Sequence, residues 1–366
     1  MADRLQCVFG LRVIFRMGPT RLLRGVAVFV LLASCGLRLA VIDPNPADIG
    51  QDTWNYLAAG ERLNAGHSIY SLAPGDRPTI IWPPGSVALG SPPLVAVIWR
   101  PLALAPDWLA MWLWWLCSAL LMFATALWVC LKGRWPALIL ACLLAPMFAA
   151  DVFSGNLNSF VAPMMAFTWW SLQAGRSRAA GLSTALGAML KIGPGALVFW
   201  LAVRREGKAV VAFALGAAVL AAISLVGAGV QQHVDFLDYA RSSTDAAWWR
   251  ASVPGILKAL GAPDIALELS IPAVWVLGAA VIWALRHRPA GAFAAAVVLS
   301  IWGTSVVHIG TVGLLLAALA PLTPAPAWIG GRTSATEPLR PPPGRRVPVP
   351  GRSRSPASTP AREEPT

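Results

Sequence analysis

The stretch Trp108–Cys130, WLAMWLWWLCSALLMFATALWVC, decides the fold class because it contains no charged residue. A helix of about 20 apolar residues crosses the ~30 Å hydrocarbon core of a bilayer. Similar stretches recur at Leu22–Ile42, Ala209–Val230 and Ile265–Leu285. Of the 366 residues, 57% are hydrophobic and only 13% are charged, a bias that the core of a soluble protein does not require. The sequence therefore predicts an integral membrane protein.

The charged residues indicate which ends of the apolar segments face the cytoplasm. The formal charge is +12, yet the basic residues form short clusters between apolar segments, which favours cytoplasmic loops over a nucleic-acid surface. The clusters are Arg12, Arg16, Arg21 and Arg24; Lys132 and Arg134; Arg176 and Arg178; Arg204, Arg205 and Lys208; and Arg286 and Arg288. The alternate loops hold the acidic residues and are expected to face outward; these residues are Asp43, Asp48, Asp52, Glu61, Asp76, Asp107, Asp151, Asp235, Asp238, Asp245, Asp264 and Glu268.

Keeping every basic cluster inside predicts an all-α, polytopic helix bundle with about ten transmembrane helices and both termini in the cytoplasm. The expected ranges are 22–42, 108–131, 135–150, 159–174, 178–190, 194–203, 209–230, 265–286, 290–306 and 308–322. Several middle segments are too short to span ~30 Å alone at ~1.5 Å per residue, so we expect them to meet at broken turns. The turns at 151–158 and 191–194 are expected to line a cavity.

The predicted organisation has a basic cytoplasmic segment at 1–21, a transmembrane domain at 22–322 and a tail at 323–366. The two principal outer loops are 43–107 and 231–264. Pro, Arg, Ser and Gly dominate the tail, which lacks the apolar residues for a packed core. We therefore expect the tail to be disordered in the cytoplasm.

The first outer loop holds the strongest catalytic candidate, Asp52. Residues Asp52, Tyr56, Ala59 and Leu63 share one helical face, which predicts a short helix in the membrane interface. A carboxylate at the outer mouth of a membrane helix can remove a proton from a hydroxyl group of a substrate in the bilayer. The alternative is a solvated loop aspartate, the ordinary fate of such a residue.

Lys191 and His308 are the polar residues that stand out inside apolar runs. Lys191 lies between Leu190 and Ile192, and an ammonium near membrane depth is a functional candidate whose partner could be a lipid phosphate. It could equally extend to the outer surface from a short helix. His308 could bind an anionic leaving group or could be a packing residue.

The turn after Gly155 provides amide groups, those of Asn156 and Asn158, on the same side as these candidates. Asn158 could also be no more than the cap of the next helix. The amide groups are thus candidates for the lining of the expected cavity.

Other residue types give no sign of a metal or nucleotide site. The five cysteines, Cys7, Cys35, Cys117, Cys130 and Cys142, lack the spacing of zinc ligands and offer no disulfide pair outside the membrane. The sequence has no Gly-rich phosphate loop and no Asp-x-Asp pair, which argues against a nucleotide substrate bound from the cytoplasm. An activated substrate must then arrive through the membrane or from outside.

Five features in order resemble one known family. They are the run Asp52…Tyr56…Gly66…Tyr70, Trp82-Pro83-Pro84, Gly155-Asn156-Leu157-Asn158, Lys191-Ile192-Gly193-Pro194 and His308. The chain resembles, over about residues 22 to 320, the bacterial mannosyltransferases of glycosyltransferase family 87, which have the GT-C fold and use polyprenyl-phosphate-mannose. The family usually has Tyr-Pro-Pro at the second feature and Gly-Gln-x-Asn at the third. The Ser-Pro and Trp that normally accompany the late histidine are absent.

The resemblance implies an inverting sugar transfer at the extracytoplasmic face of the cell membrane. Asp52 would be the catalytic base, and Lys191 and His308 would lie near the donor phosphate. Tyr56, Tyr70 and Asn158 are further expected substrate contacts. The resemblance also implies that neither a nucleotide nor a metal is required, so no cofactor is expected. The expected partners are a polyprenyl-phosphate-sugar donor, a glycolipid or glycan acceptor and membrane lipids.

Two alternatives remain open from the sequence. The sugar could be a pentose, as in polyprenyl-phosphate-dependent arabinofuranosyl transfer. A transporter or lipid flippase is the alternative without catalysis, although the paired broken helices that many transporters carry in two matched halves are not found.

Overall fold

A computed structural model describes residues 19–41, 50–78, 89–242, 251–304, 307 and 309–329. Within these ranges the regular structure is entirely helical, in agreement with the predicted all-α class. The helices are α2 Pro19–Val41, α3 Gln51–Asn64, α4 Pro93–Leu102, α5 Asp107–Lys132, α6 Trp135–Ser154, α7 Asn158–Gln173, α8 Ser177–Leu190, η1 Gly193–Gly195, α9 Ala196–Val203, α10 Gly207–Ala228, α11 Val230–Ser242, α12 Val253–Ala259, α13 Asp264–Ala284, α14 Pro289–Trp302, η2 Ile309–Leu314, α15 Leu315–Ala318 and η3 Ala320–Leu322.

Five helices of the described part are long and apolar enough to cross a membrane, namely α2, α5, α6, α10 and α13. Shorter apolar helical stretches are Pro93–Leu102, Gly193–Val203, Pro289–Trp302 and Gly310–Leu322. The membrane class is thus supported, while the count of ten crossings stays a prediction.

The largest differences from the predicted ranges lie near the functional candidates. Helix α6 continues to Ser154, past the predicted end at residue 150, and so includes Asp151. The predicted helix 308–322 is divided into η2, α15 and η3. The outer loop 231–264 is also largely helical, since α11 and α12 lie within it.

Contacts between the basic turns place them together at one end of the bundle. Ser177 Oγ, at the start of α8, donates a hydrogen bond to Glu206 Oε2, just before α10, over 3.2 Å. Trp200 Nε1 in α9 donates to the carbonyl of Pro289 at the start of α14, over 3.3 Å. The turns that precede α8 and α10 therefore lie side by side, and the turn before α14 packs against α9.

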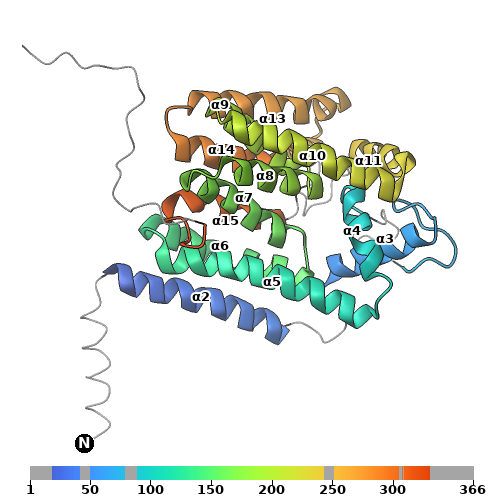
Figure 1. The fold of residues 1–366 in the computed structure, drawn as a ribbon, viewed down its shortest axis with the longest axis horizontal. Helices are drawn as coiled ribbons and strands as arrows, with labels where there is room; N and C mark the ends of the chain where they lie inside the picture. The colour runs from blue at the N-terminus through green and yellow to red at the C-terminus, as the bar shows by residue number, and fades with distance from the viewer. Residues whose placement is uncertain are drawn as a thin grey trace, which may run out of the picture. The chain divides into compact units, whose positions relative to one another are not determined.

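The opposite end is built from α3, α4 and α11, which Figure 1 shows grouped together on the right-hand side. The backbone N–H of Ile69 donates to Gln232 Oε1 of α11 over 3.0 Å. The rings of Tyr70 and Tyr239 stack with their centroids 6.1 Å apart. The two predicted outer loops are therefore packed against each other.

A bidentate ion pair fixes the chain that follows α3. Arg77 Nε and Nη2 each donate to a carboxylate oxygen of Glu61 over 2.6 Å, and Nη1 donates to Asp107 Oδ2 over 2.8 Å. The guanidinium also lies 4.6 Å from the centroid of the Trp54 ring. Arg77 thus connects α3 to the beginning of α5.

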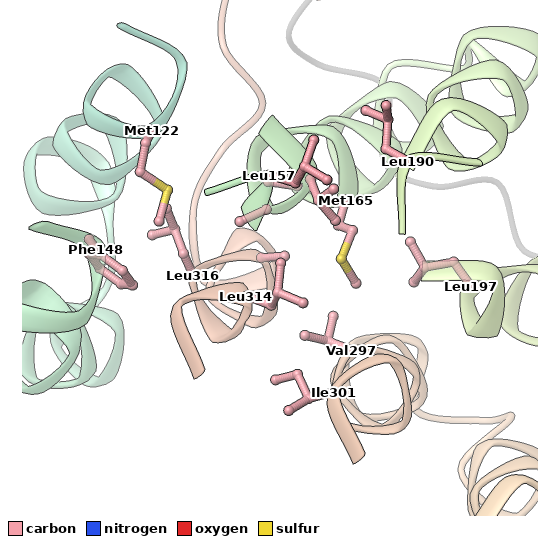
Figure 2. Close-up of a cluster of buried hydrophobic side chains, with 14 of the residues drawn as sticks. Met122, Phe148, Leu157, Met165, Leu190, Leu197, Val297, Ile301, Leu314 and Leu316 are labelled. Carbon is pink, nitrogen blue, oxygen red and sulfur yellow. The ribbon is translucent and has the colours of Figure 1, made fainter. Parts of the chain in front are cut away.

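Buried apolar side chains from many helices meet in the centre of the bundle. Figure 2 shows such side chains from α5 to α9, α14, η2 and α15; the labelled residues are Met122, Phe148, Leu157, Met165, Leu190, Leu197, Val297, Ile301, Leu314 and Leu316. Because the core includes Leu157 and Leu190, it fixes the chain beside Asn158 and Lys191. The core thereby positions two of the polar candidates.

The ordered chain continues beyond Leu322, where the sequence predicts the disordered tail to begin. Thr323 Oγ1 accepts a hydrogen bond from Trp170 Nε1 over 3.0 Å, and Ile329 is fully buried. Residues 323–329 therefore pack against the bundle. The tail expected at 330–366 lies outside the described residues, as does most of the basic segment 1–21.

Candidate active site

Asp52 lies in the first turn of α3, against the end of α6. The backbone N–H of Gly50 donates to the carbonyl of Phe153 over 2.9 Å and anchors the start of α3 there. The Asp52 side chain is half-buried, and its Oδ2 accepts a hydrogen bond from Asn156 Nδ2 over 2.8 Å. The expected short helix that carries Asp52 and Tyr56 is confirmed as α3, while its place in the membrane interface stays a prediction. The Asp52 end of α3 faces the turn between α6 and α7.

Gly155 makes the turn between α6 and α7 possible. Its φ of +68° lies in the left-handed region, which glycine adopts without steric cost. A Cβ at this position would also overlap Thr53 Oγ1. Trp114 Nε1 donates to the Gly155 carbonyl over 2.9 Å, so the turn is held from α5 as well.

The same turn orients the two asparagine side chains. Asn156 Oδ1 accepts the backbone N–H of Asn158 over 2.9 Å and so satisfies a donor in the first turn of α7. Its Nδ2 is therefore the end that points to Asp52. Asn158 is the first residue of α7 and not its cap, which is Leu157, and its own side chain forms two contacts in the cluster.

Lys191 reaches this cluster from the end of α8. The residue is extended, with φ −152° and ψ 119°, and the helical path resumes at η1. Gly193 in η1 lies so close to the Ser300 carbonyl of α14 that a Cβ would overlap it. Lys191 Nζ donates to Asn158 Oδ1 over 2.7 Å, so the side chain points into the bundle instead of extending to the outer surface.

Asp151 is the member of the cluster that the sequence did not single out. It was expected to be an outer-loop acid, but it lies in α6 with 2% exposure, and its Oδ1 accepts from Asn158 Nδ2 over 3.2 Å. The assignment failed because α6 is longer than predicted. The available signal was an acid inside an apolar segment, the same rule that identified Lys191.

The surroundings of Asp52 favour a proton acceptor of increased basicity. Burial raises the pKa of the Asp52 carboxyl above its ordinary value, while the Asn156 amide, the Ser154 hydroxyl and the charge of Lys191 act in the opposite direction. A carboxylate of raised pKa is a stronger base once it is ionised. The arrangement therefore combines a base with a nearby fixed cation.

Tyr56 lies beside Asp52, whereas Tyr70 contacts other residues of the two outer loops. Tyr56 is buried, contacts the backbone of Leu157 through its hydroxyl and is close enough for the Asp52 charge to act on it. Burial, followed by that charge, raises the pKa of the Tyr56 phenol well above its ordinary value, so the phenol stays neutral. Tyr70 instead donates to the Ser91 carbonyl of the same outer loop over 2.7 Å, and its ring stacks on Tyr239 of the second outer loop.

Some sequence candidates fall outside the described residues. They are His308, the Trp82-Pro83-Pro84 motif and the outer-loop acids Asp43 and Asp48. In the ranges that are described, no three His, Cys, Asp or Glu side chains gather as possible ligands of a metal ion.

Comparison with protein families gives one match. Residues 91–309 match the family described as glycosyltransferase family 87. The matched part contains Asp151, Asn156, Asn158 and Lys191, whereas Asp52 precedes it. Neither a curated protein nor a solved structure matches the chain.

Proposed function

Because the chain belongs to glycosyltransferase family 87, whose match covers more than half of it, we propose that this membrane glycosyltransferase uses a polyprenyl-phosphate-sugar donor. The proposed sugar is mannose, and the proposed acceptor is a lipid-linked or envelope glycan at the extracytoplasmic face. The transfer inverts the anomeric configuration. The donor is a substrate, and the proposal includes no nucleotide, metal or other cofactor.

The observation that carries this proposal is the connection of Asp52 to Lys191. The Asp52 carboxylate accepts a hydrogen bond from the Asn156 side chain, and the Asn156 side chain accepts the backbone N–H of Asn158. The Asn158 side chain in turn accepts a hydrogen bond from the Lys191 ammonium. A carboxylate and an ammonium from distant parts of the chain are thereby held in one cluster. Sugar transfer from a lipid phosphate requires a base for the acceptor and a positive charge for the leaving phosphate.

In the proposed reaction, Asp52 accepts the proton of the acceptor hydroxyl as its oxygen attacks the anomeric carbon. The bond between that carbon and the phosphate oxygen breaks on the opposite face, and the lipid phosphate leaves with the electron pair. General-base assistance of this kind contributes ~10²–10⁴ in rate. Lys191 stabilises the departing phosphate, with Tyr56, Tyr70, Asn158 and His308 as further substrate contacts.

The proposed topology places the cluster outside and the basic turns in the cytoplasm. It is supported by the hydrogen bonds that join the basic turns at the other end of the bundle. To test it, single cysteines at Gly207 and Gly261 are introduced into a chain without native cysteines. An impermeant thiol reagent applied to intact cells should label position 261 and not position 207. Labelling of both or the reverse pattern would contradict the topology.

The proposed function is tested with purified protein and synthetic polyprenyl-phosphate-mannose. Wild type should transfer mannose to glycolipid acceptors from the cell envelope, and the inverted anomer is identified by NMR. Asp52→Asn has the same shape and still accepts from Asn156, so it should fold normally and lose ~10²–10⁴ of the turnover. Asp264→Asn, an exposed acid at the start of α13, is the matched control.

Unchanged turnover in folded Asp52→Asn would remove Asp52 from the mechanism. Transfer from a polyprenyl-phosphate-arabinofuranose donor, and not from the mannose donor, would show that the transferred sugar is a pentose. Movement of labelled lipid across liposomes without a new glycosidic bond would instead indicate a flippase.

A further inference from the structure

Asp151 is a buried acid that the proposed reaction does not use. It lies in the last turns of α6 with 2% of its surface exposed. Removing a carboxylate from water costs several kcal/mol unless charge and hydrogen bonds compensate it. The groups that surround Asp151 therefore indicate which residues it acts on.

The side chain of Asn158 lies between Asp151 and Lys191. Its Nδ2 donates to Asp151 Oδ1 over 3.2 Å, and its Oδ1 accepts from Lys191 Nζ over 2.7 Å. An amide has one donating end and one accepting end, so these two charged neighbours allow only one orientation. Reversing the amide would turn its carbonyl to the carboxylate and its N–H groups to the ammonium. Asp151 and Lys191 therefore fix each other's position through Asn158.

Segment η2 closes over the Asp151 carboxylate at two glycines. A Cβ at Gly310 would stand 2.8 Å from Asp151 Oδ1, and a Cβ at Gly313 would overlap Oδ2. Oδ2 is buried and makes no hydrogen bond in the part of the chain that the structure describes. The carboxylate thus occupies a space that these glycines leave open, although one of its oxygens gains no hydrogen bond there.

We propose that Asp151 is a positioning residue of the transfer site, which orients Asn158 and balances the charge of Lys191 so that the ammonium is held ready for a lipid phosphate. The inference rests on the proposed function at one point, which is that the lipid phosphate of the donor binds Lys191. Asp151 itself does not touch the donor. Its role is to keep a cation in place within an apolar bundle.

A contribution to stability alone does not explain this arrangement. Buried ion pairs are often no more stabilising than apolar side chains of similar volume, whereas removing only one partner leaves an uncompensated charge. A simple core at this position would need neither the acid, the lysine nor the two glycines. Their joint presence is explained by a cation that must stay oriented.

The test measures binding of polyprenyl phosphate, without sugar, to the purified full-length protein in nanodiscs. The variants are Asp151→Asn, Lys191→Met and the double variant, with Thr168→Val as a matched buried control in α7. We expect Asp151→Asn to weaken binding about 10-fold, which lies within the usual coupling of residues in one network. The double variant should bind no more weakly than Lys191→Met, because Asp151 acts only through the lysine.

Thermal unfolding of the same variants supplies a second readout. Each single variant leaves one charge without its partner and should unfold at a lower temperature, whereas the double variant should recover part of the loss. This comparison keeps the proposal testable if Asp151→Asn folds poorly. Thr168→Val should leave binding unchanged, since Thr168 contacts Thr184 between α7 and α8 and not the cluster.

Three outcomes would overturn the proposal. The first is that Asp151→Asn binds polyprenyl phosphate as wild type does. The second is that this variant binds it more tightly, which would make Asp151 a competitor of the phosphate. The third is that the effects of the two substitutions on binding are strictly additive in the double variant. These outcomes differ from failure of the proposed function. That failure would appear as unchanged sugar transfer by Asp52→Asn, whatever the binding of polyprenyl phosphate.

Discussion

Asp52 and Asn156 are separated by 104 positions in the sequence, yet Asp52 Oδ2 lies 2.8 Å from Asn156 Nδ2. This hydrogen bond joins the beginning of α3 to the turn between α6 and α7. It also links the proposed base to the turn that begins α7, where Asn158 holds Lys191. The geometry of this link determines how the proposed site should respond to pH and to substitution.

Replacing Asn156 by Asp should shift the pH dependence of transfer. The new carboxylate can still accept the backbone N–H of Asn158, but it no longer donates to Asp52 and adds a like charge. Both changes raise the pKa of Asp52, so the ionised base forms at higher pH. The acidic limb of kcat/KM against pH should move upward by about 1 unit or more.

The control for this pH experiment is Asn64→Asp, at the other end of α3. Asn64 Oδ1 accepts from Arg100 Nε over 3.0 Å, a contact that an aspartate retains. The acidic limb of the Asn64→Asp profile should match wild type. Coincident acidic limbs for Asn156→Asp and wild type would show that Asp52 is not the titrating base.

Gly155→Ala should disrupt the contact between α3 and α6. The alanine would be strained at positive φ, and its Cβ would overlap Thr53 Oγ1. We expect a loss of about 3 kcal/mol of folding free energy, from strain and overpacking together. Thermal unfolding in detergent measures the loss, and sugar transfer should fall with it because the Asp52 end of α3 is displaced.

Gly175→Ala separates the effect of backbone strain from the effect of the overlap with Thr53. Gly175 has a similar φ of +72°, but a Cβ there would meet nothing within 4 Å. It should therefore lose only the ~1–2 kcal/mol of backbone strain and keep its turnover. Equal losses in both variants would mean that the contact with Thr53 has no effect.

Gly313→Ala should weaken the binding of polyprenyl phosphate without changing any charged residue. The added methyl group would push on Asp151 Oδ2 and, through Asn158, displace Lys191. Overpacking of this kind costs ~1–3 kcal/mol in stability. Lipid binding to purified protein is the measurement.

Gly195→Ala is the control for this substitution because Gly195 also lies in a 3₁₀ segment. Its Cβ would make only an ordinary contact, 3.9 Å from the Cβ of Ala188. Gly195→Ala should therefore bind polyprenyl phosphate as wild type does. Wild-type binding by Gly313→Ala as well would contradict the role of η2 in holding Asp151.

Helices with strong apolar patterns were predicted closely, whereas the polar site was predicted only in part. The expected helix 265–286 is α13, Asp264–Ala284. Asp151 was placed in a loop because an acid at the end of an apolar run looks like the first solvated residue. The helical segments of the second outer loop were missed because α11 and α12 are short and, unlike the long spans, lack a membrane-length apolar run.

The sequence by itself determined that this is an all-α membrane protein and where its long helices lie, because the thickness of the hydrocarbon layer dictates the length and polarity of each segment. It also identified Asp52 as a catalytic candidate in the first outer loop and Lys191 as a charge within an apolar run. Only the tertiary structure decided that Asp52, Asn156, Asn158, Lys191 and Asp151 form one cluster. Contacts over such distances depend on how the helices pack at Gly155, Gly193, Gly310 and Gly313, where missing side chains permit close approach, and no local periodicity encodes that packing.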